Sequence, residues 1–234
     1  MSRWASVRAV TGTVFSLFQL GTLTTAAVAV FHPDTPLPPE WNPTAPLSVT
    51  DDVTPLTSWK LRRTIADPVA CLEALSTGAS AEPMPPFEWS ENCHIRNRVR
   101  LDGVGGAAIN AVETTCATAL KTALWTYHGI RPAAEDILGV EVTGLRQIGS
   151  YNCRPINTTS GPSNRWSTHA TADAIDITGF DLANGARIRL IDDWQGDTAE
   201  ARFLRVVRDR ACDWYGTTLG PDFNSLHADH FHLQ

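Results

Sequence analysis

The sequence of 234 residues lacks several features that would place a protein in a familiar class. Its 19 lysine and arginine residues form no prominent cluster and the formal net charge is -6, which argues against a nucleic-acid-binding surface. No pair of cysteines has the close spacing of a zinc ribbon, and no internal repeat is present. The 43% hydrophobic and 19% charged residues argue against global disorder and suit one sizeable globular domain with a tail.

A long stretch without charge lies near the N-terminus. Residues 9–31 follow Arg3 and Arg8 and comprise 23 uncharged residues, enough for a helix to cross a hydrocarbon core of about 30 Å. The two arginines favour an N-terminus on the inner side of the membrane and the rest of the chain outside. An Ala-Val-Ala sequence ending at Ala29 would also suit a signal peptidase. Residues 1–32 are therefore predicted to be a membrane anchor or a cleaved signal segment, with a buried helix as the alternative.

The cysteines agree with export. All five lie beyond the apolar stretch, where disulfides can persist in an oxidising environment. Five is an odd number, so at least one thiol is expected to be free or to pair with another chain. We predict two structural disulfides, with the fifth cysteine buried in a helix: Cys71–Cys93, Cys153–Cys212, and Cys116 unpaired.

Proline divides the chain into a spacer and a domain. Residues 33–58 contain seven of the fifteen prolines, and this density blocks both helices and sheet ladders, so an extended spacer is predicted there. The domain is predicted to span residues 59–234. Near its start a short helix is expected at 67–77, followed by an irregular patch at 83–86.

Hydrophobic periodicity predicts the elements of this domain. Apolar residues recur at three- and four-residue steps between residues 106 and 128, which is typical of an amphipathic helix ended by Gly129 and Pro132. Helices grouped on one side of hairpin-linked strands indicate an α+β domain. The remaining predicted elements are helices at 132–138 and 198–214, and strands at 140–151, 174–180, 187–192 and 230–234, with a turn at 183–185.

Four of the seven histidines fall in two short segments, 167–176 and 227–232. In a strand alternate side chains share a face, so His230 and His232 should point the same way. A loop leading into the strand that holds Asp176 could bring His169 beside that carboxylate. Two imidazoles and one carboxylate complete the protein ligands of a catalytic zinc site, which keeps its fourth position for water.

These segments resemble the SxHxxGxAxD and HxH signatures of zinc peptidases related to D-alanyl-D-alanine carboxypeptidases and murein endopeptidases. A closer resemblance, to the bacterial extensin-like C-terminal domain family, covers roughly residues 41–234 and is most specific after residue 140. It is carried by Gly-Ser-Tyr-Asn-Cys-Arg at 149–154, Pro-Asp-Phe-Asn at 221–224 and Asp-His-Phe-His-Leu at 229–233, with Trp-Asn-Pro at 41–43 and Lys-Leu at 60–61. One departure is Ala172, which stands where the wider group has glycine.

The resemblance implies a Hedgehog/D,D-peptidase type of fold, with a small antiparallel sheet flanked by helices, and a set of site residues. The zinc ligands would be His169, Asp176 and His232, and Arg154 would polarise the substrate. The proton shuttle would be Asp229 or His230, although strict alternation points Asp229 away from the metal unless the strand begins after it. The alternative role for Asp229 is to orient a ligating imidazole. The further candidates are His227 as an active-site histidine, and Trp166 and Ser167 as substrate-binding residues, with plain packing as the alternative for Trp166.

Two functions follow as hypotheses. The first is a zinc-dependent hydrolase that cleaves an amide bond in peptidoglycan peptides by metal-activated water. The second is a non-catalytic, zinc-bearing protein of the same fold that binds the cell wall or acts as a scaffold. Both imply peptidoglycan or another cell-wall polymer as the partner, the membrane as a contact of the N-terminal segment, and no nucleic acid. The expected location is the bacterial cell envelope, either anchored in the inner membrane facing the periplasm or secreted.

Overall fold

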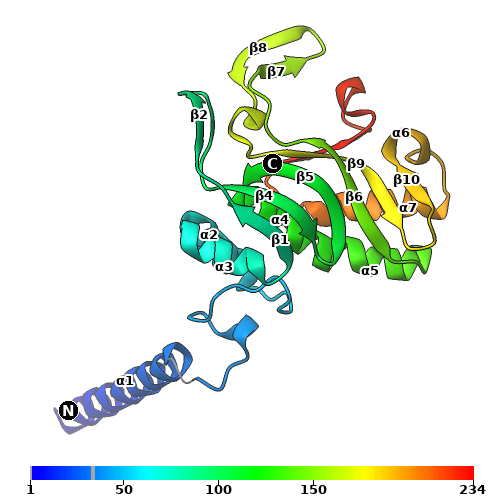
Figure 1. Cartoon of the computed structure of the whole chain (residues 1–234). Helices are drawn as coiled ribbons and strands as arrows, with labels where there is room; N and C mark the ends of the chain where they lie inside the picture. Colours follow the sequence, from blue (N-terminus) through cyan, green and yellow to red (C-terminus); the bar gives the residue numbers. More distant parts are fainter. Residues whose placement is uncertain (1, 33–34) are drawn as a thin grey trace.

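The computed structural model describes residues 2–32 and 35–234, with side chains from residue 14 onward (Figure 1). Its first element is the helix α1 (Ser2–Phe31), whose stretch Val14–Phe31 is predominantly apolar and has no buried residue. A helix of this length and composition could be a signal anchor or a membrane span. The side chains of Arg3 and Arg8, on which the predicted orientation rests, lie outside the described ones.

The proline-rich segment is only partly the extended spacer that the sequence predicts. It includes the 3-10 turn η1 (Pro39–Trp41), and further on Leu47 and Val49 are buried in the core of the domain. The backbone is also held by long-range hydrogen bonds from Lys60 Nζ to Pro39 O (2.6 Å) and from His128 Nε2 to Val49 O (2.9 Å). The later part of this segment therefore belongs to the domain, because its few apolar residues find partners there.

An eight-stranded sheet forms the centre of the domain. Its order is β1-β4-β5-β6-β9-β12-β11, with β10 paired to β9. All pairs are antiparallel except β5 and β6, so the sheet is mixed rather than wholly antiparallel as expected. Parallel neighbours need a crossover connection, and here the helix α4 and the turns after it supply one. The strands are β1 (Ala79–Pro83), β4 (Arg98–Val104), β5 (Ala107–Thr115), β6 (Val142–Gly149), β9 (Ile175–Leu182), β10 (Arg187–Arg189), β11 (Thr218–Leu219) and β12 (Phe231–Leu233).

Helices cover one face of this sheet, as Figure 1 shows for α4, α5 and α7. The core between the layers contains Trp125, Phe180 and Phe203, which are fully buried and meet edge to face. Trp125 also donates its indole N–H to Val207 O at 2.8 Å, so this large side chain leaves no buried donor unpaired. The helices are α2 (Thr57–Ala66), α3 (Pro68–Ser76), α4 (Cys116–Trp125), α5 (Arg131–Ala133), α6 (Leu190–Asp193) and α7 (Ala199–Ala211), and the π-helical turns are η2 (Thr126–Ile130) and η3 (Ala134–Leu138).

The predicted helix over residues 106–128 is wrong in its first half, which forms strand β5. The register between β4 and β5 shifts at a bulge, so that Ala108 pairs with Gly103 but Val112 pairs with Leu101. This bulge separates the buried Ile109 and Val112 by three residues, which imitates the spacing of a helix. The helix begins only at residue 116, where the Thr115 side chain accepts a hydrogen bond from the Thr118 amide.

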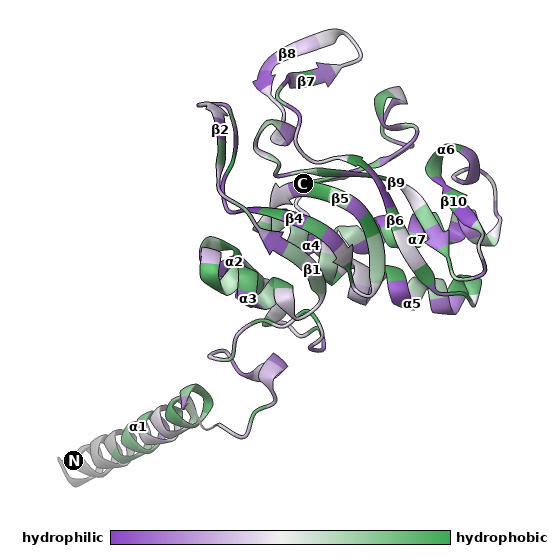
Figure 2. Ribbon diagram, in the orientation of Figure 1, coloured by the Kyte–Doolittle hydropathy of each residue, from purple (hydrophilic) through white to green (hydrophobic). Residues whose placement is uncertain are grey.

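The other predicted elements of the domain are confirmed within a few residues, except that residues 190–193 form α6 instead of continuing a strand. Two hairpins were not predicted: β2 (Phe87–Ser90) with β3 (Cys93–Ile95), and β7 (Pro155–Thr158) with β8 (Gly161–Trp166). Both project from the sheet (Figure 1), and the β7–β8 hairpin is mostly hydrophilic (Figure 2). The β7–β8 hairpin carries few apolar residues, so hydrophobic periodicity gives little sign of it, and the strands of the β2–β3 hairpin are only four and three residues long.

The predicted disulfide pairing is wrong. The bridges are Cys71–Cys116 and Cys93–Cys153, and Cys212 is a free, exposed thiol. Cys116 is the first residue of α4, and α4 packs against α3, which contains Cys71. The cysteine that was expected to be unpaired is therefore bridged. The second bridge joins the β2–β3 hairpin to the loop that follows β6.

Candidate metal centre

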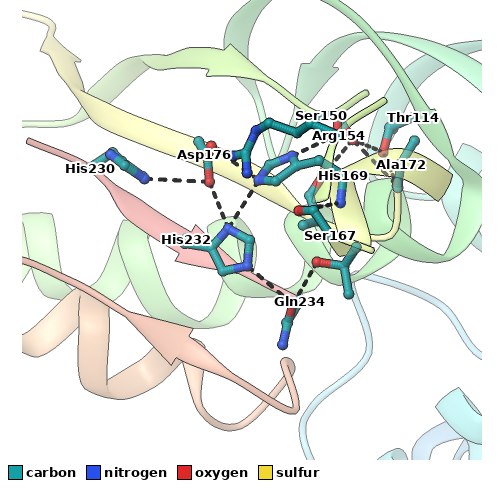
Figure 3. A network of polar contacts seen from close by, with 12 residues as sticks. Thr114, Ser150, Arg154, Ser167, His169, Ala172, Asp176, His230, His232 and Gln234 are labelled. Carbon is teal, nitrogen blue, oxygen red and sulfur yellow. Dashed lines mark hydrogen bonds and ion pairs between the residues drawn. The ribbon is translucent and has the colours of Figure 1, made fainter. Parts of the chain in front are cut away.

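His169, Asp176 and His232 meet at one point, although they are far apart in the sequence (Figure 3). His169 lies in the 3-10 turn η4 (Thr168–Thr171), Asp176 near the start of β9, and His232 directly opposite Asp176 in β12. His169 Nε2 is 3.1 Å from Asp176 Oδ2, and His232 Nδ1 is 3.0 Å from Asp176 Oδ1. The two imidazole nitrogens are themselves 3.0 Å apart. The chain thus gathers two nitrogens and a carboxylate around one small volume.

The other nitrogen of each imidazole is already occupied. His169 Nδ1 is 2.7 Å from the Ser150 backbone carbonyl, and His232 Nε2 is 3.1 Å from Gln234 Oε1. Because a carbonyl oxygen can only accept, these outer nitrogens carry the hydrogen, and the facing nitrogens present lone pairs whenever the imidazoles are neutral. Two lone pairs and a carboxylate at this separation repel one another unless a proton or a cation lies between them. The centre is therefore built to hold a positive charge.

The carboxylate of Asp176 is held in its ionised form. Burial raises the pKa of this group, since water no longer solvates the charge. Hydrogen bonding with His169 and His232, and the positive charge that His169 and His230 can carry, outweigh burial and hold the pKa of Asp176 well below its usual value. At neutral pH the centre accordingly contains a full negative charge among neutral or positive imidazoles.

The turn that presents His169 is fixed by buried hydroxyl groups. Ala172, which ends the turn, has a left-handed backbone with φ +54°, a conformation that costs a residue other than glycine roughly 1–2 kcal/mol. Its carbonyl accepts hydrogen bonds from Thr114 Oγ1 (3.1 Å), Thr118 Oγ1 (3.1 Å) and Ser150 Oγ (3.3 Å). These three donors hold the alanine in the position where the resemblance predicts glycine, and no sequence pattern indicates them.

His230 and Asp229 form a second contact with the centre. His230 Nδ1 is 2.8 Å from Asp229 Oδ1, and His230 Nε2 is 3.8 Å from Asp176 Oδ1. Strand β12 begins only at Phe231, and the Asp229 side chain is 56% exposed. Asp229 therefore reaches the centre through His230, as the hydrogen-bond acceptor of His230 Nδ1.

His227 lies on the outer side of this pair. Its ring centroid is 5.3 Å from that of His230 and 5.9 Å from that of His232, and its Nδ1 is 2.7 Å from Asn224 Oδ1. Burial, followed by the charges of His230 and His232, lowers the pKa of His227 to about 4. This imidazole is thus neutral at neutral pH, with Nε2 unprotonated.

Arg154, Trp166 and Ser167 lie at the base of the β7–β8 hairpin. The Arg154 carbonyl accepts from the Ser167 amide (3.1 Å), and the Asn152 amide donates to the His169 carbonyl (2.9 Å), so this base runs alongside η4. Ser167 is buried and its hydroxyl caps η4, whereas the Trp166 side chain is 45% exposed. The Arg154 guanidinium donates to the Pro155 carbonyl at 3.2 Å. The predicted site residues therefore gather in one region, with the hairpin at its rim.

Comparison with known proteins places this region within a family. No curated protein and no solved structure matches the chain. The family model described as "Extensin-like protein C-terminus" matches residues 69–234, which include α3 from its second residue, the whole sheet, both disulfides and every residue of the centre. The matched part is well over half of the sequence, and the chain therefore belongs to the extensin-like protein C-terminus family.

Proposed function

We propose that this protein is a zinc-dependent hydrolase that cleaves an amide bond in peptidoglycan peptides. The observation that carries the proposal is the orientation of His169 and His232, whose outer nitrogens are bound to acceptors while their inner nitrogens face Asp176. This arrangement is typical of metal-ligating histidines, which donate their second N–H to a carbonyl or carboxylate. The Hedgehog/D,D-peptidase type of fold and the kinship with zinc peptidases belong to the same proposal.

The donor set fits zinc. Imidazole nitrogen is a borderline donor and carboxylate oxygen a hard one; Zn²⁺ accepts both, whereas Mg²⁺ and Ca²⁺ prefer oxygen alone. Tetrahedral ligands at about 2.0–2.2 Å from zinc lie roughly 3.3 Å from one another. The separations of 3.0 and 3.1 Å among His169, Asp176 and His232 are close to that value. Three protein ligands also leave one position for water, which a hydrolase requires.

The remaining residues would handle the proton and the substrate. When bound, zinc supplies a Lewis acid that lowers the pKa of a coordinated water to about 7. His230 Nε2 lies on the same side as Asp176 and would accept the proton, and Asp229 would stabilise the charge that His230 then gains. Arg154, beside η4, supplies a cation that could bind the carbonyl oxygen of the substrate.

Peptidoglycan as substrate is supported by the resemblance to peptidases of that polymer and by the apolar helix α1, which would place the domain outside the cytoplasmic membrane. The bacterial cell envelope is the proposed location, with the protein either anchored in the membrane and facing the periplasm or secreted.

The second candidate function is a non-catalytic zinc-bearing cell-wall binding or scaffold protein. The exposed Trp166 at the rim supports it, because aromatic side chains bind sugar rings and peptides without any chemistry.

The decisive experiment measures metal and cleavage together. The full chain is incubated with purified sacculi and soluble muropeptides, with zinc and with chelator, and the released fragments are identified by mass. We expect one zinc per chain and zinc-dependent cleavage, both lost in His169→Ala and both kept in the control His94→Ala, whose ring bonds to its own hairpin. Zinc binding with intact muropeptides and firm retention on sacculi would favour the scaffold; absence of zinc would overturn both functions.

A further inference from the structure

We infer that Gln234, held in place by Thr168, is a positioning residue that fixes which nitrogen of His232 faces the metal. The inference rests on the proposed zinc site. Gln234 Oε1 is 3.1 Å from His232 Nε2 and 2.6 Å from Thr168 Oγ1, so one amide oxygen accepts from both (Figure 3). Neither Gln234 nor Thr168 contributes a ligand.

The amide oxygen decides the tautomer of His232. With the hydrogen on Nε2 donated to Gln234, the lone pair is on Nδ1, the nitrogen that faces Asp176 and His169. The opposite tautomer would place an N–H inside the ligand triangle and a lone pair against the Gln234 oxygen. Gln234 therefore favours the form of His232 that can bind a cation and disfavours the other.

The same oxygen joins the two segments that carry the histidine ligands. Thr168 precedes His169 in η4, and Gln234 follows β12, which carries His232. Gln234 is itself fixed by reciprocal backbone hydrogen bonds with Thr217, both 3.0 Å long. The hydrogen bond from the Thr168 hydroxyl to Gln234 thus links η4 to the end of β12. We expect this link to help maintain the 3.0 Å separation between His169 Nε2 and His232 Nδ1.

The test measures zinc affinity of the full chain by competition with a chromophoric chelator. Gln234→Met keeps the size of the side chain but has no acceptor, and we expect it to weaken zinc binding by about 10–100-fold. Gln234→Glu keeps only acceptors and should bind zinc at least as well as the native chain. The exposed Gln195→Met is the matched control and should leave the affinity unchanged.

Thr168→Val, which removes the hydroxyl at nearly constant volume, should weaken binding by about threefold to tenfold. It should add little in the Gln234→Met background, since the hydroxyl acts through the amide. The absorption spectrum of the Co²⁺-loaded chain should change in Gln234→Met and stay native in Gln234→Glu.

Native affinity in Gln234→Met would overturn the inference, and so would equal losses in Gln234→Met and Gln234→Glu, which would indicate packing alone. If the native chain bound no zinc, the proposed function itself would fail. Thermal unfolding of the metal-free variants separates loss of folding from loss of affinity, and Thr168→Val keeps the inference testable if Gln234→Met does not fold.

Discussion

The four histidines around the centre form two pairs that differ in how they are held. The inner pair, His169 and His232, is bound on its outer side by the Ser150 carbonyl and the Gln234 amide, both fixed by the sheet or by buried hydroxyls. The outer pair, His227 and His230, is bound by Asn224 and Asp229 in the loop before β12.

This difference suits the histidines to two tasks, metal binding and proton transfer. Neutral acceptors that are rigidly held suit imidazoles that must keep a lone pair in a constant direction. A carboxylate such as Asp229 suits an imidazole that gains and loses a proton, because it stabilises the charged form. We therefore expect the inner pair to retain the metal and His230, in the outer pair, to serve the reaction.

The largest effect should follow loss of an inner histidine. His169→Ala removes a ligand and leaves Asp176 with one imidazole, so zinc content should fall from about one per chain to near zero and hydrolysis by roughly 1,000-fold or more. Metal analysis and muropeptide cleavage measure both. If the His169→Ala variant retained zinc, His169 would not be a metal ligand and the inner pair would not differ from the outer pair in metal binding.

Replacing His230 should separate activity from metal. We expect His230→Ala to retain zinc but to lose about 100-fold to 10,000-fold in hydrolysis, because the proton acceptor is gone. Asp229→Asn should lose less, since it keeps an acceptor for His230 Nδ1. Loss of zinc in His230→Ala would instead assign this histidine to the inner pair.

The outer pair should also make the metal-free domain sensitive to acid. His227 has a pKa of about 4 when folded and about 6.5 when unfolded, so the unfolded chain binds more protons between these values. Stability is then full above pH 6.5 and falls as the pH drops towards 4, by about 1–2 kcal/mol after allowance for the partial exposure of the ring. Urea unfolding at pH 7 and pH 4, with chelator present, should show a smaller loss in His227→Phe. If His227→Phe lost as much stability between pH 7 and pH 4 as the native chain, the acid sensitivity would come from groups other than His227.

The smallest effect is expected at the turn beside the inner pair. Ala172→Gly relieves the left-handed strain but loosens the unfolded chain and removes a buried methyl group, so the free energy of unfolding should change by less than about 1 kcal/mol. Zinc affinity should stay native because the three hydroxyls still hold the carbonyl. A large loss of affinity would indicate that the methyl group, and not the hydroxyls, positions His169.

The approach of His169 to Asp176 could be predicted from the sequence because a tight turn leading into a strand is a local property. His232 was added to them by the family resemblance, since the pairing of β12 with β9 that brings it opposite Asp176 is not visible in local spacing. It could not predict Gln234, Thr114, Thr118 or Ser150 as partners, since nothing in their spacing shows that they face the ligand segments. The bulge in β5 misled the helix prediction, and the disulfides were missed because pairing depends on how α3 and α4 pack. The α+β class followed from patterns along the chain, whereas the parallel step between β5 and β6 depends on topology.

The Cys93–Cys153 bridge also bears on the timing of maturation. Cys153 stands between Asn152, which bonds to the backbone of His169, and Arg154, which bonds to that of Ser167. A newly synthesised chain in a reducing compartment would lack this tether and would hold the loop beside the ligands more loosely. Under the proposed function and location, oxidation after export would complete this geometry, so that the hydrolase would become fully competent only outside the cytoplasm.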